Sequence, residues 1–358
     1  MKHFVPVTIA MILVILFGES TFFWQDKFQT PLVPRPGLGN DADSITLLFA
    51  GDIMLDRGVE YYIQKNGGDW RFPFLNIADF LQKADLVFGN LESVISDKGE
   101  KQGSIYSFRA DPRTLEGLSF AGFDVLSVAN NHSLDYGSEA LVDSIQRLKD
   151  AGIIPVGGGS TNKEAYAPAL KYFYTSKYSS VTTISILAYT AVGSSLWEAS
   201  ENTPGIAWVD EHNLAEFTQR IKDAKKEVDI LVLSIHFGEE YQTQPNDMQQ
   251  LIAKSAVIAG ADIVIGHHPH VIQLIEPEGS SDVRPEGTQS PREPERPVER
   301  YKEGWIAYSL GNFIFDQGFS KETTEGLLLE VTIHNKKITR VSPRPIHLNS
   351  LFQPRLAE

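Results

Sequence analysis

The sequence predicts an α/β domain with a largely buried sheet. From Ile45 onward, short apolar runs typical of strands alternate with segments of helical periodicity. The chain has 358 residues, of which 42% are hydrophobic, which is enough apolar material for a sizeable core and for one to three domains. Polar residues of the kinds that bind ligands recur directly after the predicted strands. Alternating β and α units of this kind favour an α/β fold.

The N-terminus predicts a membrane anchor over residues 1–28. An apolar run spans residues 4–17 and resumes at 21–24, and no small-x-small cleavage site follows it. Lys2 precedes the run, which favours a cytoplasmic N-terminus with the rest of the chain outside. We therefore expect a single-pass protein of the cell membrane with an extracytoplasmic domain. The alternative is a buried N-terminal helix, which Pro6 fits poorly.

Two segments read as irregular. Residues 29–44 are rich in Pro, Gly and Asp and are expected to link the anchor to a domain over residues 45–350. Residues 276–303 are dense in Pro, Glu, Arg, Ser and Gly and predict a long exposed, flexible loop inside that domain.

Strand and helix signals follow one another along the domain. Strands are predicted at residues 45–50, 86–88, 125–128, 153–156, 182–189, 230–235, 263–265, 305–310 and 326–334. Helices are predicted at residues 77–83, 112–120, 138–151, 211–227 and 248–259. In each case a helix precedes a strand or a strand precedes a polar cluster, so the pattern is one of repeated β and α units.

Polar clusters at strand ends are the strongest functional signal. Because the carboxyl ends of strands in an α/β sheet line one crevice, clusters far apart in sequence should converge there. The candidate residues are Asp52, Asn90, Glu92, Asn130, Asn131, His132, Asp135, His236, His267, His268, His270, Asn312 and Asp316. Carboxylate, amide and imidazole together favour divalent Mn, Fe or Zn, and two such ions could act jointly on a phosphoryl or acyl oxygen.

Each cluster also has a purely structural interpretation that involves no ligand binding. Asp52 could cap a helix, and Glu92 could be a solvated loop residue. The Asn-Asn-His run could be a turn, and His236 could be a hydrogen-bonded core histidine. His268 and His270 are harder to explain in this way, because the proline between them stiffens the turn and can aim both rings together. Taken jointly, the clusters predict a shared metal site.

Composition excludes several classes of partner and chemistry. The formal net charge is −14 and the pI about 5.1, which argues against nucleic acid as a partner. An anionic polymer would have to meet local positive charge, of which bound metal ions are one source. The chain has no cysteine, so thiolate metal sites, cysteine nucleophiles and disulfides are excluded.

Six motifs in order resemble one family. They are GDIMLDR, GNLES, ANNHSLDYG, HFGEEY, GHHPHV and YSLGNFIFDQ, spread over residues 51–317. Together they resemble the bacterial capsule-synthesis CapA/PgsA family, of the poly-γ-glutamate type, which in turn is similar to calcineurin-like metallophosphoesterases. The resemblance covers residues 45–317. It implies a four-layer α-β-β-α sandwich of the metallophosphatase type, with the site at one sheet edge.

The resemblance also implies roles for individual residues. The residues that match metal ligands are Asp52, Glu92 as the bridging carboxylate, Asn131, His236, His268 and His270. His132 matches the histidine that contacts the substrate and protonates the leaving group, with Asp135 as its orienting partner. The residues expected to line the substrate pocket are Asn90, Asn130, Asn312 and Asp316, together with His267, to which no specific role is assigned.

The sequence departs from the phosphoesterase pattern at two ligand positions. Met54 stands where that pattern has a histidine, and Glu92 replaces a shorter aspartate. Three functions follow as expectations. The first is a part in making or exporting an anionic capsule polymer such as poly-γ-glutamate, through metal-assisted hydrolysis or transfer. The second is an extracytoplasmic phosphatase or phosphodiesterase, and the third is a non-catalytic subunit that docks with membrane-bound synthetase partners.

Overall fold

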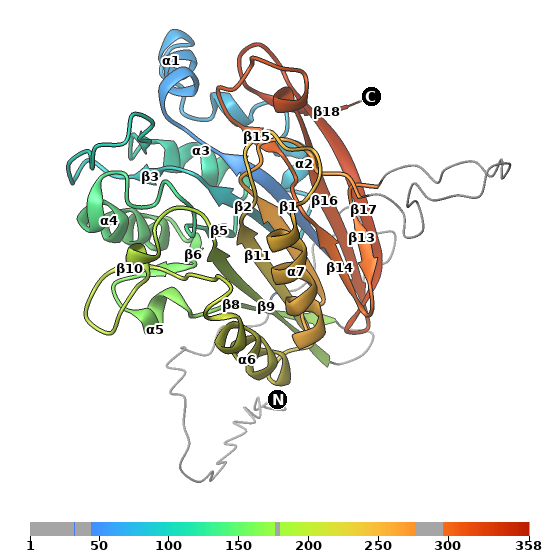
Figure 1. Ribbon diagram of the computed structural model, residues 1–358. Helices are drawn as coiled ribbons and strands as arrows, with labels where there is room; N and C mark the ends of the chain where they lie inside the picture. Colours follow the sequence, from blue (N-terminus) through green and yellow to red (C-terminus); the bar gives the residue numbers. More distant parts are fainter. Residues whose placement is uncertain (1–31, 33–43, 176–179, 276–295, 358) are drawn as a thin grey trace, which may run out of the picture. The chain divides into compact units, whose positions relative to one another are not determined.

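The computed structural model describes Leu32 and residues 44–175, 180–275 and 296–357 (Figure 1). The predicted anchor, all of the predicted linker except Leu32 and Ser44, and residues 276–295 of the predicted loop lie outside the described residues. Within the described ranges, no helix combines the length and the apolar character needed to cross a membrane.

An eight-stranded sheet carries the first half of the domain. Its order is β18-β17-β16-β1-β2-β5-β6, and β15 also pairs with β1. The strands are β1 (Ile45–Ile53), β2 (Leu86–Leu91), β5 (Val125–Ser127), β6 (Ile154–Val156), β15 (Asn312–Ile314), β16 (Glu325–His334), β17 (Lys337–Leu348) and β18 (Pro354–Leu356). From β1 to β6 the neighbours are parallel, whereas β16, β17 and β18 are antiparallel to their neighbours.

A six-stranded sheet carries most of the second half. Its order is β13-β14-β12-β11-β9-β8, parallel at its centre and antiparallel at both edges. The strands are β8 (Ala169–Thr175), β9 (Ser180–Thr190), β11 (Ile230–His236), β12 (Ile263–His267), β13 (Glu299–Tyr301) and β14 (Gly304–Ala307). Two short pairs complete the described strands: β3 (Val94–Ile95) with β4 (Arg109–Ala110), and β7 (Gly158–Gly159) with β10 (Gly205–Ile206).

Seven α-helices and three single-turn 3₁₀ helices connect the described strands. The α-helices are α1 (Arg57–Lys65), α2 (Ala78–Leu81), α3 (Thr114–Ala121), α4 (Gly137–Asp150), α5 (Asn162–Ala165), α6 (Leu214–Lys226) and α7 (Asp247–Ala259). The 3₁₀ helices are η1 (Phe72–Phe74), η3 (Ser195–Trp197) and η4 (Glu322–Thr324). Helix α7 starts at a capping box, in which the Asn246 side chain accepts from the Gln249 N–H and the Gln249 side chain accepts from the Asn246 N–H.

Three apolar cores define the layers. Phe49 of the eight-stranded sheet and Val232 of the six-stranded sheet belong to one core, so the two sheets pack face to face. Leu48, the neighbour of Phe49, points to the other face, into a core shared with α1, α3 and α4. Leu233 likewise points away from the other sheet, into a core shared with α6 and α7, which cover that face in Figure 1. The described residues therefore form layers of helices, sheet, sheet and helices.

The expected α/β class is confirmed, and described strands also lie inside the predicted loop and beyond residue 350. Residues 299–301, which fall in the predicted loop, form the edge strand β13, in which the Arg300 guanidinium carbon lies 5.0 Å from the centroid of the Trp305 ring, within the range of a cation–π contact. The domain also continues past residue 350 into β18. In the predicted linker, Leu32 exchanges two 2.7 Å backbone hydrogen bonds with edge strand β8.

Candidate metal centre

Strand register brings the predicted site residues to one edge. In the eight-stranded sheet, Asp52 at the end of β1 is paired with Asn90 on β2 and with Asn312 on β15. In the six-stranded sheet, His236 at the end of β11 is paired with His267 at the end of β12. Because β1 pairs with β2 and β11 with β12 in parallel, Asp52, Asn90, His236 and His267 all lie at the carboxyl ends of their strands, where Asn312 begins β15.

Two glycines allow the segment between β14 and β15 to cross closely between the sheets. A Cβ on Gly51, just before Asp52, would lie 1.9 Å from the carbonyl oxygen of Gly311. A Cβ on Gly266, just before His267, would lie 1.8 Å from the carbonyl oxygen of Tyr308. Only glycine fits such approaches, and they place the ends of β1 and β12 beside one connecting segment.

Asp52 is the buried anion at the centre of the site. Asn90 Nδ2 donates to Asp52 Oδ1 at 2.9 Å, and the backbone N–H of His268 donates to Oδ2 at 3.2 Å. The Nδ1 atoms of His267 and His270 lie 3.2 and 3.3 Å from the same carboxylate. Burial raises the pKa of Asp52, but the adjacent His267 and His270 outweigh it and hold the pKa well below its ordinary value.

Glu92 is a second buried carboxylate, and its environment is the opposite. Its Oε1 has no hydrogen-bond partner among the described residues, and the nearest ring nitrogens are His270 Nε2 at 3.6 Å and His132 Nε2 at 3.8 Å. Burial, followed by the charges of Asp52 and Glu240, raises the pKa of Glu92 well above its ordinary value. A nearby cation would relieve both effects.

His268 and His270 lie on a turn with a strained backbone. His268 and His270 have φ values of 96° and 59°, in the left-handed region that residues other than glycine rarely adopt. Both side chains are buried, and burial lowers the pKa of His268 to about 3. Burial, with the nearby His268 as the next cause, also lowers the pKa of His236, whose Nε2 lies 2.8 Å from Asn131 Oδ1. The rings of His236 and His268 are therefore neutral, which is the form that binds metals.

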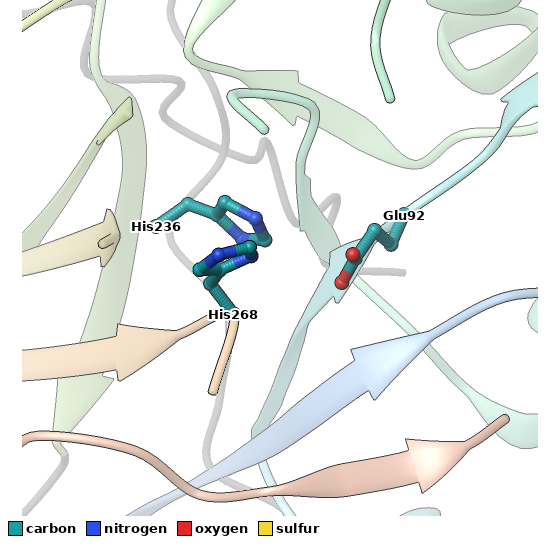
Figure 2. Close-up of side chains that lie close together, drawn as sticks. All are labelled: Glu92, His236 and His268. Atoms are coloured by element: carbon teal, nitrogen blue, oxygen red, sulfur yellow. The ribbon is translucent and has the colours of Figure 1, made fainter. Parts of the chain in front are cut away.

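Three overlapping groups of side chains could each hold a metal ion, with ligand atoms within 4.8 Å of one another. The groups are Glu92, His236 and His268; Asp52, Glu92 and His270; and Glu240, His268 and His270. Figure 2 shows the carboxylate of Glu92 pointing toward the rings of His236 and His268. Glu92 belongs to the two fully buried groups, as a bridging ligand would.

The residues present fit a divalent metal. Glu92 Oε1 and His268 Nδ1 are buried polar atoms that lack a hydrogen-bond partner in the described part of the chain. Leaving such atoms unpaired is costly, and a bound cation would satisfy them. The donor set of carboxylate, imidazole and amide oxygen suits Mn, Fe or Zn.

A histidine–carboxylate pair lies beside this centre. His132 Nδ1 is 2.7 Å from Asp135 Oδ2, and the same carboxylate oxygen accepts from the Phe108 N–H at 2.7 Å. The Phe108 ring packs on the His132 ring with centroids 4.0 Å apart. Asp135 and Phe108 thus fix the orientation of His132, whose Nε2 faces Glu92.

The other predicted pocket residues divide into supporting and peripheral ones. Asn312 Oδ1 lies 3.0 Å from His270 Nδ1, and Asn130 Nδ2 donates to Asn90 Oδ1 at 3.2 Å and to the backbone of Leu91. His267 lies on the inner side of Asp52, 1% exposed, against the Phe88 ring. Asp316 belongs to none of the three groups. It forms an ion pair with Arg57.

Sequence reasoning missed one candidate ligand of the site. Glu240 belongs to one of the three groups but was not predicted as a ligand. The available signal was its place in the HFGEEY motif, two residues after the glycine. Met54, which stands where the phosphoesterase pattern has a histidine, is fully buried in the apolar core on the helix side, and its sulfur accepts the N–H of Asp56 at 3.1 Å.

Comparison with known proteins identifies the family. The family model described as bacterial capsule synthesis protein PGA_cap matches residues 46–317. A curated relative, the PGA biosynthesis protein CapA of Bacillus subtilis, is 31% identical over 98% of this chain and 85% of its own length. The chain belongs to the bacterial capsule synthesis protein family. The range that the family model matches includes every residue of the candidate metal centre.

One further relative and one solved structure are also similar to this chain. A relative from Mycobacterium tuberculosis, described as a probable polyglutamine synthesis accessory protein, is 28% identical over 67% of this chain and 72% of its own length. Among solved structures, a phosphatase from Mycoplasma pneumoniae matches 85% of this chain and 94% of its own with a TM-score of 0.43 and 14% identity.

Proposed function

We propose that this member of the capsule synthesis family acts in the synthesis or export of an anionic polymer such as poly-γ-glutamate, through a metallophosphatase-like site that holds one or two divalent ions. The observation that carries the proposal is the buried carboxylate of Glu92, whose Oε1 lacks a hydrogen-bond partner among the described residues and which is shared by two ligand groups. The name of the relative from Bacillus subtilis, a PGA biosynthesis protein, supports the polymer.

The chain's own residues have distinct tasks in this proposal. Asp52, Glu92, His236, His268 and His270 would hold the ions, and Asn131 would add an amide oxygen. When bound, divalent ions supply Lewis acidity toward a phosphoryl, ester or amide oxygen. His132 donates a proton from Nε2 to the leaving group, because Asp135 accepts from Nδ1–H and thereby fixes the ring's orientation.

A non-catalytic role is the second candidate, and one observation favours it. Met54 points into the core and supplies no ligand, so the buried set is smaller than the phosphoesterase pattern implies. The accessory role named for the mycobacterial relative is consistent with such a subunit. In that case the domain would contribute to a complex with membrane-bound synthetase subunits.

We further propose that residues 1–28 anchor the chain in the cell membrane with the domain outside. The proposal is supported by the apolar run at 4–17 and by Lys2 before it. In fractionated cells, the full chain should sediment with membranes, and a chain lacking residues 1–30 should not. External protease should degrade the domain of the full chain in intact cells from which the wall has been removed.

Elemental analysis and a hydrolysis assay test the function. Stoichiometric Mn, Fe or Zn in the wild type, lost in a His268→Ala, His270→Ala double variant, would support the metal centre. For an enzyme, His132→Gln should keep the metal and lower hydrolysis of poly-γ-glutamate or of a phosphodiester by about 10²- to 10⁴-fold. Full metal without activity on either substrate would favour the non-catalytic subunit, and no metal in folded protein would contradict the proposed centre.

A further inference from the structure

Glu240 lies in a loop that is tied to the histidine turn on both sides. The loop, residues 237–243, follows β11 and runs beside residues 267–274. The Phe237 N–H donates to the His267 carbonyl at 3.1 Å, and the Tyr241 N–H donates to the Pro269 carbonyl at 2.8 Å. Because these bonds flank Glu240, its backbone position relative to the two histidines is set by the fold.

A side-chain network fixes the far end of the same loop. Tyr241 has a φ of 64°, and its hydroxyl accepts from Gln317 Nε2 at 3.2 Å. Gln317 Oε1 accepts from Asn312 Nδ2 at 3.1 Å, and Asn312 Oδ1 lies 3.0 Å from His270 Nδ1. The loop is therefore connected through side chains to His270, one of its two histidine neighbours. A strained backbone held by such contacts is common at functional sites.

The carboxylate of Glu240 completes the third group of possible ligands. One of its oxygens, a ring nitrogen of His268 and a ring nitrogen of His270 lie within 4.8 Å of one another. The other two groups consist of buried residues alone, whereas Glu240 is exposed. A second, independent observation points to a ligand here, since His268 Nδ1 is buried without a hydrogen-bond partner among the described residues.

We propose that Glu240 is a further metal ligand, which binds with His268 and His270 on the solvent side of the centre and compensates for the ligand that Met54 does not supply. The inference rests on the proposed metal centre. Because Glu240 is the one exposed member of the three groups, it is also the ligand that an anionic group of a substrate can displace most readily. Its neighbour Glu239 is equally exposed and belongs to none of the three groups.

Metal titration of the full chain tests this role without an activity assay. The metal-free protein is titrated with Mn²⁺ and with Zn²⁺ by calorimetry, for the wild type and for Glu240→Gln. Glu239→Gln is the matched control, because it removes the same charge one residue away. Glu240→Gln should weaken one binding step by about 10- to 100-fold, and Glu239→Gln should leave both steps within about 2-fold of the wild type.

Each other outcome contradicts the proposal in a recognisable way. Wild-type affinity in Glu240→Gln would overturn the ligand role and leave the buried centre intact. Equal weakening in both variants would show a general effect of charge and not ligation. A wild type that binds neither ion would overturn the centre and Glu240 together. If Glu240→Gln does not fold, Glu240→Asp keeps the charge but shortens the side chain, and an unchanged affinity there would also contradict ligation.

Discussion

Two of the site's histidines hold backbone conformations that cost free energy. The positive φ values of His268 and His270 each correspond to about 1–3 kcal/mol of strain, which the surrounding contacts must offset. The His268 N–H bond to Asp52 and the Asn312 contact of His270 are two such contacts. The strained turn brings both rings near the buried carboxylate of Glu92. The backbone strain of this turn therefore coincides with the proposed metal ligands.

The depressed pKa of His268 predicts a pH dependence of stability in the metal-free protein. Its pKa is about 3 in the folded state, because of burial, and about 6.5 in the unfolded chain. Between these values the unfolded state binds more protons, so the free energy of unfolding falls as pH falls from 6.5 toward 3. From pH 7 to pH 5 the wild type should lose about 2 kcal/mol more than His268→Gln.

Urea denaturation in EDTA at the two pH values measures this difference. The control is His212→Gln, since the His212 side chain is 83% exposed. His212→Gln should lose as much stability as the wild type does. The contribution of Glu92, whose pKa is raised and whose effect has the opposite sign, is common to all three proteins. Equal losses in the wild type and in His268→Gln would show that His268 is protonated in the folded protein.

At the scale of elements, the site depends on how closely the segment between β14 and β15 can pass β1. The backbone of Gly51 lies against the carbonyl group of Gly311. The next residue, Asp52, donates its backbone N–H to the same carbonyl oxygen at 3.1 Å. Gly311 itself has a φ of 69°. A side chain at position 51 would therefore push apart the strand and the segment that together carry Asp52 and Asn312.

Gly51→Ala should destabilise the protein and weaken metal binding together. The added Cβ would meet a backbone oxygen, which cannot rotate away, so the loss should reach about 3 kcal/mol in the free energy of unfolding. Gly318→Ala is the control, because its Cβ would meet only the Phe352 ring, at an ordinary 3.5 Å. Denaturation of both variants measures their stability, and metal titration measures their metal affinity. A Gly51→Ala protein as stable as Gly318→Ala would contradict the prediction.

Elements of strong periodicity could be predicted from the sequence, and those of weak periodicity could not. The apolar run at 45–50 became β1, and the amphipathic segment at 138–151 became α4. Strand β17 was missed, because its residues are almost all exposed or half-buried and it contains Pro343 and Pro345. The convergence of the polar clusters was predictable, since strand ends meet at one edge. The direction of the Met54 side chain was not predictable. It depends on the bulge in β1 after Asp52, which determines the face of the chain that turns toward the core.

At the scale of the whole molecule, the proposed centre connects the two sheets. Asp52 and Glu92 lie at the ends of β1 and β2 in the eight-stranded sheet, whereas His236 and His268 lie at the ends of β11 and β12 in the six-stranded sheet. The first ligand group, of Glu92, His236 and His268, therefore spans both sheets. An ion bound there would stabilise the face-to-face packing that forms the central core, and so the domain as a unit.

Metal binding should accordingly raise the melting temperature of the whole domain in a single transition. An ion at about 1,000 times its Kd that binds only the folded state adds about 4 kcal/mol, which for a domain of this size is on the order of 5–10 °C. Asp52→Asn should lose most of this rise because it removes a buried carboxylate, whereas Asp97→Asn, on an exposed side chain, should keep it. Calorimetric scans with EDTA and with Mn²⁺ measure the shift. A rise of equal size in both variants would place the stabilising ion elsewhere, and a rise confined to part of the transition would show that the ion does not join the two sheets.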